Sequence, residues 1–170
     1  KEVKHHNKRQ LIKFKIYTPN KICAYRHRTF SYKEPEMLDW IDDYGGEGTF
    51  YDIGANVGIY SIYYAKSKAG KVISFEPSVF NLRQLAKNIS VNGLENSISI
   101  VPNALSKSSA VEVFKNGNSD EGGALSAFGV EYGYDGKPIS SNINYAIAGF
   151  SLDDFVSCGV VKELPTLIKI

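Results

Sequence analysis

One short stretch of this chain combines two buried strands, a tight turn, a helix and a terminal acid in a fixed order. The apolar run at residues 49–53 is followed by the turn 54–58, and residues 58–68 then place apolar side chains at helical spacing. A second apolar run, 71–76, ends in Glu76. Two buried strands joined through a helix form the crossover unit of a parallel sheet. The stretch therefore predicts a βαβ unit with Glu76 at the carboxyl end of its second strand, near the turn that follows the first.

The turn of this unit lacks glycines that the usual dinucleotide fingerprint requires. That fingerprint, Gly-x-Gly-x-x-Gly, needs glycine where this chain has Asn56 and Ile59, so a pyrophosphate could not approach the backbone as closely. The remaining pattern, Asp52-x-Gly54-x-Asn56-x-Gly58, is similar to the first motif of S-adenosylmethionine-dependent methyltransferases, with asparagine in place of the middle glycine. Asparagine is one of the few other residues that tolerate a left-handed backbone. With the acid downstream, the turn predicts a Rossmann-like site for S-adenosyl-L-methionine.

The alternation of strands and helices continues beyond this unit. A helix is predicted at about 78–92, a strand at 97–101 and a further buried strand at 166–170. Because strands that alternate with helices favour a parallel sheet, the predicted class is α/β, with a mostly parallel Rossmann-like sheet. Residues 104–150 are looser, and the part from 115 to 149 is rich in Gly, Ser and Asn. We expect a lid or binding segment there rather than a second domain.

Two finer predictions concern the packing of these segments. Residues 110–114 are expected to pair with residues 124–128 across the turn signal Asn116-Gly117. The helix at about 78–92 is expected to bury the apolar residues that recur at helical spacing, namely Leu82, Leu85, Ala86 and Ile89.

The first 45 residues precede the repeating pattern and form a separate N-terminal region. Residues 11–17 alternate between apolar and polar side chains, which predicts a half-buried strand, and residues 21–25 are expected to form the return strand of a hairpin. A helix is predicted over 34–44. We therefore divide the chain into an N-terminal arm, hairpin and helix at 1–45 and a cofactor-binding domain at 46–170.

The composition fits a soluble intracellular protein. Of the 170 residues, 43% are hydrophobic and 22% are charged, which is enough apolar material for a core. Cys23 and Cys158 lie far apart without metal-ligand spacing, so we expect both to be reduced packing residues and the protein to be cytoplasmic. No apolar run is long enough to span a membrane, and no metal is expected.

Several segments of the chain together resemble one known family: Phe50–Ser61, Val72–Pro77, Asn81–Asn88, Val101–Ala104, Ser151–Asp154 and Leu167–Ile170. They occur in the order found in FkbM-type methyltransferases of the class I superfamily, and the resemblance covers residues 49–170. It implies a seven-stranded sheet in the order 3-2-1-4-5-7-6, with strand 166–170 beside strand 49–53. It also implies that the domain is incomplete after Ile170, where the last three strands would follow.

The resemblance implies O-methylation of a hydroxyl on a sugar, polyketide or similar small molecule. The cofactor-binding positions that it implies are Asp52, Gly54, Ala55, Asn56, Gly58, Glu76, Pro77, Asn103 and Ala104. Asp52 would hold the methionine ammonium, and the helix start would receive the cofactor's carboxylate. Glu76 would accept the ribose hydroxyls, and Pro77 would pack against adenine. Asn103 and Ala104 match the adenine-side motif by position. We assign no catalytic residue.

Other functions stay open from the sequence alone. Residues 1–28 hold nine Lys/Arg and one acid, which permits a nucleic-acid methyltransferase, although no aromatic and basic interleaving supports it. A non-catalytic fragment that keeps the cofactor fold is a further alternative, and Asn56 and Ile59 disfavour a nicotinamide-binding oxidoreductase. The expected partner is a hydroxylated small-molecule or glycan substrate. Nucleic acid is disfavoured, no membrane association is expected, and a homodimer stays open.

Overall fold

The computed structural model of the chain describes residues 1–133, 136–140, 143–159 and 161–170. Its helices are α1 (Lys21–Thr29), α2 (Pro35–Tyr44), α3 (Ile59–Lys68), α4 (Val79–Val91) and α5 (Leu152–Ser157). Its strands are β1 (Glu2–His6), β2 (Leu11–Lys15), β3 (Thr49–Ile53), β4 (Lys71–Phe75), β5 (Ile98–Val101), β6 (Ala104–Leu105), β7 (Ala110–Lys115), β8 (Ala127–Phe128), β9 (Asn144–Phe150) and β10 (Pro165–Lys169).

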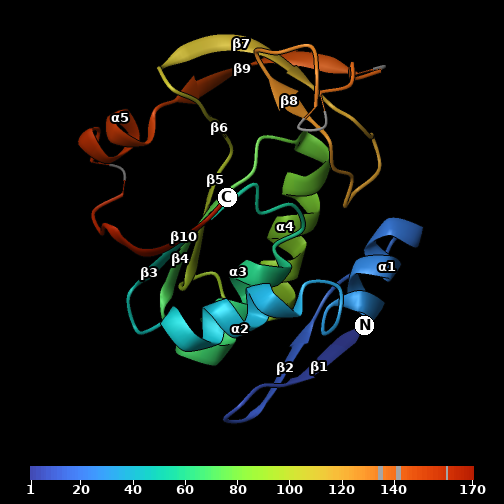
Figure 1. Cartoon of the computed structure of the whole chain (residues 1–170), viewed down its shortest axis with the longest axis vertical. Coiled ribbons are helices and arrows are strands. Elements are labelled where there is room, and N and C mark those ends of the chain that lie inside the picture. Colours follow the sequence, from blue (N-terminus) through green and yellow to red (C-terminus); the bar gives the residue numbers. More distant parts are fainter. Residues whose placement is uncertain (134–135, 141–142, 160) are drawn as a thin grey trace.

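A four-stranded parallel sheet in the order β10-β3-β4-β5 forms the centre of the protein (Figure 1). The register places Asp52 beside Ser74 of β4 and Lys169 of β10. This confirms the predicted α/β class and parallel sheet, and it confirms that the strand near residue 166 pairs with β3. Since all four strands run in one direction, their carboxyl ends meet along one edge, where a Rossmann-like sheet binds its ligands.

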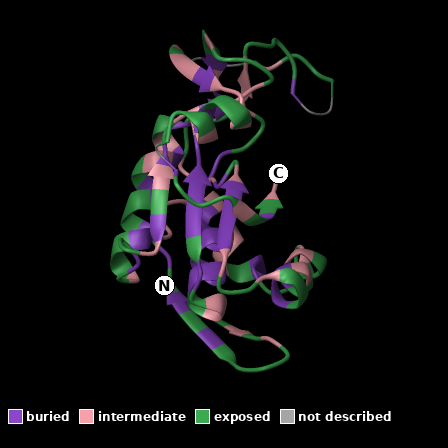
Figure 2. Cartoon of the chain, turned by 90° about the vertical axis from the view of Figure 1, so that its left-hand side faces the viewer, coloured by how far each residue is buried: buried purple, intermediate pink, exposed green. Residues whose placement is uncertain are grey.

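The two faces of this sheet are covered unequally. On one face, Phe50 of β3 and Val72 of β4 join a large apolar cluster with residues of the helices α2, α3 and α4. On the other face, Tyr51 and Phe75 pack with Phe155 of α5 in a smaller cluster. Figure 2 shows the central strands as the most continuously buried part of the chain. Packing on both faces explains why β3 and β4 are buried at almost every position rather than at alternate ones.

The N-terminal region packs directly onto this core. The strands β1 and β2 pair antiparallel, and their inward side chains Val3, Ile12 and Phe14 belong to the same apolar cluster as the α3 and α4 residues. The alternation predicted for residues 11–17 is therefore confirmed. The predicted return strand at residues 21–25 is wrong, because those residues begin α1 instead.

The start of α1 explains this error. Asn20 has an extended backbone, and its side-chain oxygen accepts a hydrogen bond from the amide of Cys23 at 2.8 Å. This is an N-cap, which satisfies a donor that the helix start would otherwise leave free. The strand that pairs with β2 comes from residues 2–6, within the basic arm, which carries too little apolar alternation to indicate a strand by itself.

A second, smaller sheet in the order β6-β9-β7-β8 lies beyond the carboxyl ends of the central strands (Figure 1). The predicted pairing of residues 110–114 with 124–128 is confirmed only in part, because β7 and β8 pair at Phe114↔Phe128 and at the adjacent position. The main partner of β7 is β9, which pairs with it at six positions. Within the described residues, no helix is long and apolar enough to cross a membrane.

Candidate functional site

The turn between β3 and α3 has a left-handed backbone at three positions. Gly54, Asn56 and Gly58 have φ angles of 68°, 55° and 80°. The left-handed conformation expected for Asn56 is thus confirmed. A β-carbon on Gly58 would lie 2.3 Å from Cδ1 of Leu85, so glycine is required there for packing against α4. A β-carbon on Gly54 would meet no atom within 4 Å, so that position faces open space.

Glu76 lies directly across from this turn, at the carboxyl end of β4, and is only 5% exposed. Its Oε2 accepts a hydrogen bond from the backbone N–H of Asn56 at 2.6 Å, and its Oε1 accepts one from the N–H of Ser78 at 2.9 Å. Burial raises the pKa of the Glu76 carboxyl, and these hydrogen bonds act against that rise. A carboxylate has about four lone-pair positions, so Glu76 retains capacity for further donors.

A cavity of about 220 Å³ lies between the turn and Glu76. Four of the residues singled out from the sequence line it, namely Gly54, Asn56, Glu76 and Pro77. The other lining residues are Asn81, Phe114, Gly123, Ala124, Leu125 and Ser126. The structure thus brings the first turn and the second acid together at one hollow, at the carboxyl edge of the parallel sheet.

Residues 116–126, here called the covering segment, close one side of this cavity. The side-chain amides of Asn56 and Asn81 both donate to the carbonyl of Gly123, at 2.6 and 3.2 Å. The amide N–H of Gly122 donates to Oδ1 of Asn81 at 2.8 Å. The covering segment is therefore fastened both to the turn and to α4. It lies within the region that the sequence predicts as a lid or binding segment.

Asp52 lies beneath the turn and does not line the cavity. Its side chain is fully buried; Oδ2 accepts from Ser61 Oγ at 2.6 Å, and Oδ1 lies 3.0 Å from Nζ of Lys169. The same ammonium donates to the carbonyls of Ile53 and Gly54, at 3.0 and 3.2 Å. Lys169 thus neutralises Asp52 and supports the turn from below. The contact of Asp52 with a cofactor ammonium stays a prediction.

The remaining predicted positions fall into two groups. Ala55 and Gly58 belong to the turn itself, where the amide of Ala55 donates to the carbonyl of Phe75 at 2.9 Å and Gly58 is the N-cap residue of α3. Asn103 and Ala104 lie outside the lining of the cavity. Asn103 donates to the carbonyl of Ala148 at 3.1 Å, and Ala104 pairs with β9. Their proposed contact with adenine therefore has no support from this arrangement.

Sequence reasoning missed the amides of α4. Leu85 and Ile89 are buried as expected, whereas Leu82 is half-buried and Ala86 is exposed. Their places on the inner face are taken by the buried amides of Asn81, Gln84 and Asn88. Asn88 donates to the carbonyl of Val57 in the turn at 2.9 Å. The spacing of these amides at i, i+3 and i+7 was visible in the sequence and marks one helix face.

The structure shows no metal centre in its described ranges: no group of three or more His, Cys, Asp and Glu side chains could hold an ion. Two amides of the turn before α3 already have acceptors within the chain. The N–H of Asn56 donates to Glu76, and that of Val57 donates to Oδ1 of Asn56 at 2.9 Å. An anion would therefore have to displace these bonds to use the first amides of the turn.

No protein-family model matches this chain, and no curated protein matches it. Among solved structures, it is similar to the human methyltransferase 10 domain-containing protein, with 22% identity and a TM-score of 0.32 over 51% of this chain and 40% of that one. It is similar at 22% identity and a TM-score of 0.32 to a protein of Pyrococcus horikoshii assigned as a transferase, over 59% of this chain and 35% of that one.

A third structure is a protein of Listeria monocytogenes assigned as an S-adenosylmethionine-dependent methyltransferase. It shows 13% identity and a TM-score of 0.37, over 73% of this chain and 79% of that one. The chain spans 40% and 35% of the length of the first two proteins. At these identities and TM-scores, the likenesses assign neither a family nor an activity to the chain.

Proposed function

We propose that this chain binds S-adenosyl-L-methionine and forms the cofactor-binding part of a methyltransferase. The observation that supports this most directly is the open face of Gly54 opposite the buried carboxylate of Glu76, at the carboxyl edge of a parallel sheet. This is the place where Rossmann-like sheets bind nucleoside cofactors. The turn between them has asparagine and isoleucine where a dinucleotide fingerprint needs glycine, which favours a cofactor without a pyrophosphate.

The residues present fit such a cofactor. The missing side chain of Gly54 leaves room for close approach, and Glu76 has lone pairs free for hydroxyl donors. The cavity of about 220 Å³ is smaller than the roughly 300–1,000 Å³ typical of ligand pockets. The covering segment fills part of the space, so binding requires it to move outward. The Asn56 and Asn81 bonds to Gly123 are the contacts that would open.

Each residue then has a distinct binding role. Glu76 accepts the ribose hydroxyls; hydrogen bonds to a charged group contribute about 1.5–3 kcal/mol. Pro77 lines the same cavity and offers an apolar surface for the base. Asp52 and Lys169 hold the turn in shape from below. When bound, the cofactor supplies a sulfonium methyl group, which an acceptor oxygen attacks in line as the carbon–sulfur bond breaks.

The acceptor that we propose is a hydroxyl on a sugar, polyketide or similar small molecule. This finer proposal rests on the resemblance to FkbM-type methyltransferases over residues 49–170. The chemistry is dominated by alignment, because holding two reactants in the right orientation can supply about 7–11 kcal/mol. No side chain of this chain is assigned as the base that takes the hydroxyl proton.

Calorimetric titration tests the cofactor proposal. Purified protein is titrated with S-adenosylhomocysteine, with S-adenosylmethionine and with NAD under the same conditions. We expect both sulfur nucleosides to bind and NAD to bind at least tenfold more weakly. Equal binding of NAD, or no binding of either sulfur nucleoside to folded protein, would show that the turn serves another purpose. Transfer of a labelled methyl group to a panel of hydroxylated acceptors then tests the reaction class.

A nucleic-acid acceptor is a second candidate, which the charge of the N-terminal hairpin favours. Lys4 and Lys13 are paired across the hairpin, and both, with Lys15, are exposed. A set of exposed cations of this kind attracts phosphate backbones. Fluorescence anisotropy with single- and double-stranded oligonucleotides at several salt concentrations distinguishes the candidates. Binding that falls steeply with salt and is followed by methylation of the oligonucleotide would favour nucleic acid.

A further inference from the structure

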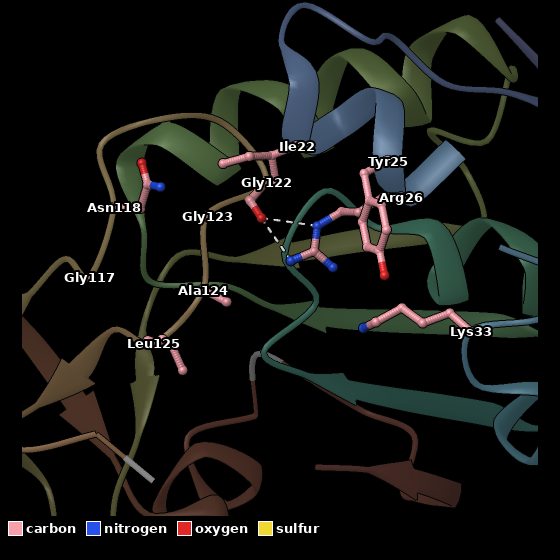
Figure 3. A pocket seen from close by; sticks show the side chains of 10 residues that line it. All are labelled: Ile22, Tyr25, Arg26, Lys33, Gly117, Asn118, Gly122, Gly123, Ala124 and Leu125. Carbon is pink, nitrogen blue, oxygen red and sulfur yellow. Dashed lines mark hydrogen bonds between the residues drawn. The ribbon is translucent and has the colours of Figure 1, made fainter. Parts of the chain in front are cut away.

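A second cavity, of about 290 Å³, lies between α1 and the covering segment. Figure 3 shows the side chains of Tyr25, Arg26 and Lys33 along one side of it, with the covering segment along the other. Gly123, Ala124 and Leu125 line this cavity and also the cofactor cavity. These three residues separate the two cavities, so the outward movement of the covering segment that cofactor binding requires would bring the two cavities into contact.

The charge of this second cavity is positive. Two of its ten lining residues, Arg26 and Lys33, are cationic, and none is acidic. The guanidinium of Arg26 donates through Nε and Nη2 to the carbonyl of Gly122, at 2.9 and 2.7 Å. That carbonyl is uncharged, and within the described ranges Arg26 has no carboxylate within ion-pair distance. The charge of Arg26 is therefore not neutralised by an ion pair.

The acid next to Lys33 in the chain already has two partners. Glu34 pairs with Lys33 at 2.6 Å, and its other oxygen accepts the hydroxyl of Tyr60. The hydrogen bond from Lys33, followed by the one from Tyr60, lowers the pKa of Glu34. The pair between Glu34 and Lys33 is exposed, and such pairs contribute only about 0–1 kcal/mol, so Lys33 can turn toward an incoming anion at little cost.

Resting on the proposed function, we infer that this second cavity is the methyl-acceptor site and that its acceptor carries a carboxylate or phosphate beside the hydroxyl. Arg26 and Lys33 bind the anionic group, since guanidinium and ammonium groups are the usual partners of both anions. The ring of Tyr25, which is 47% exposed, supplies a flat amphipathic surface beside them. Once the covering segment has moved outward, the hydroxyl faces the cofactor cavity.

Ligand-observed NMR titration of the full chain, saturated with S-adenosylhomocysteine, tests this inference. The probes are galactose, galacturonate and galactose 6-phosphate, which share a ring and differ in charge. We expect at least one of the two anionic sugars to bind about tenfold more tightly than galactose. The comparison between galacturonate and the phosphate shows which anion the cavity prefers.

Two charge-reversed variants locate the effect. Lys33→Glu should abolish the preference for anionic sugars, whereas Lys21→Glu should retain it. Lys21 is exposed at the start of α1 and does not line the cavity, and its substitution changes the net charge by the same amount. Arg26→Gln should also lower the preference, with the unfolding temperature measured to check that loss of the Gly122 contact has not loosened the fold.

The outcomes separate this inference from the proposed function. Equal binding of the three sugars, or equal loss of preference in Lys33→Glu and Lys21→Glu, would overturn the inference. If S-adenosylhomocysteine still binds in that case, the cofactor proposal stands. If wild-type protein fails to bind S-adenosylhomocysteine at all, the cofactor proposal fails and the acceptor site fails with it.

Discussion

Replacing Lys169 by methionine should destabilise this protein far more than the loss of an ordinary surface charge. The ammonium of Lys169 forms an ion pair with Oδ1 of Asp52 at 3.0 Å, and within the described residues that oxygen accepts no hydrogen bond from any other group. The Lys169 side chain is 15% exposed and the Asp52 side chain is fully buried. Methionine is unbranched and only slightly shorter than lysine but carries no charge, so the variant leaves a buried carboxylate without its counter-charge.

The size of the effect follows from that burial. Breaking a buried ion pair by removing one partner costs about 3–5 kcal/mol, whereas exposed pairs contribute about 0–1 kcal/mol. Proteins of this kind have a total stability of about 5–15 kcal/mol, so the loss is a large fraction of the whole. For a chain of this length it corresponds to a fall in melting temperature of roughly 6–20 °C.

Urea unfolding followed by circular dichroism measures this cost. The matched control is the double variant Asp52→Asn with Lys169→Met, which removes both charges and should regain more than half of the lost stability. A second control, Lys8→Met, removes a cation from the exposed pair with Asp43 and should cost less than about 1 kcal/mol. If Lys169→Met costs no more than Lys8→Met, then Asp52 does not depend on Lys169 and the reasoning is wrong.

Three further predictions concern the cofactor cavity. Glu76→Ala should weaken S-adenosylhomocysteine binding by about 1.5–3 kcal/mol, or roughly 10- to 150-fold, by calorimetry; wild-type affinity in a folded variant would remove Glu76 from the site. Gly54→Val should abolish binding of S-adenosylhomocysteine. The control is Gly93→Val, because Gly93 has a similar φ of 64° and lies outside the cavity; this variant should strain the backbone without affecting the ligand. Equal binding by the two variants would contradict the prediction. The pKa of Glu76 in the folded protein is raised above 4.5, so the folded state holds this proton more tightly than the unfolded state does. The stability of wild type relative to Glu76→Gln should therefore fall as pH rises from about 4.5 through that raised pKa, and then level off. Urea unfolding across this pH range measures the difference, and a constant difference would refute the prediction.

The local sequence pattern was sufficient to predict the central βαβ unit. Residues 49–76 combine two short, mainly apolar strands with a glycine turn, and both signals depend on neighbours only a few positions away. The left-handed backbone of Asn56 followed from the chemistry of that one residue. For this reason the turn, the second acid and their meeting at one edge of the sheet could be predicted without coordinates.

Other parts of the site depend on contacts between distant segments and could not be read in this way. Lys169 is one residue in an apolar strand, and only the register of β10 against β3 places it beside Asp52. The covering segment has no periodic pattern, and its position comes from bonds that Asn56 and Asn81 donate to Gly123. The strand predicted at residues 21–25 was wrong for a local reason. The N-cap at Asn20 favours a helix there, although the short apolar run by itself indicates a strand.

The pairing of β10 with β3 has a consequence for how the protein folds. The contact between Lys169 and Ile53 joins residues 116 positions apart in the chain. Contacts at such separation form slowly, because a long loop must close before they can stabilise anything. At ribosomal rates of about 5–20 residues per second, β3 leaves the ribosome roughly 6–23 s before Lys169 does. During that interval Asp52 has no counter-charge and one edge of β3 has no partner strand. The nascent chain is therefore open to misassociation at β3, a strand that is buried in the finished protein.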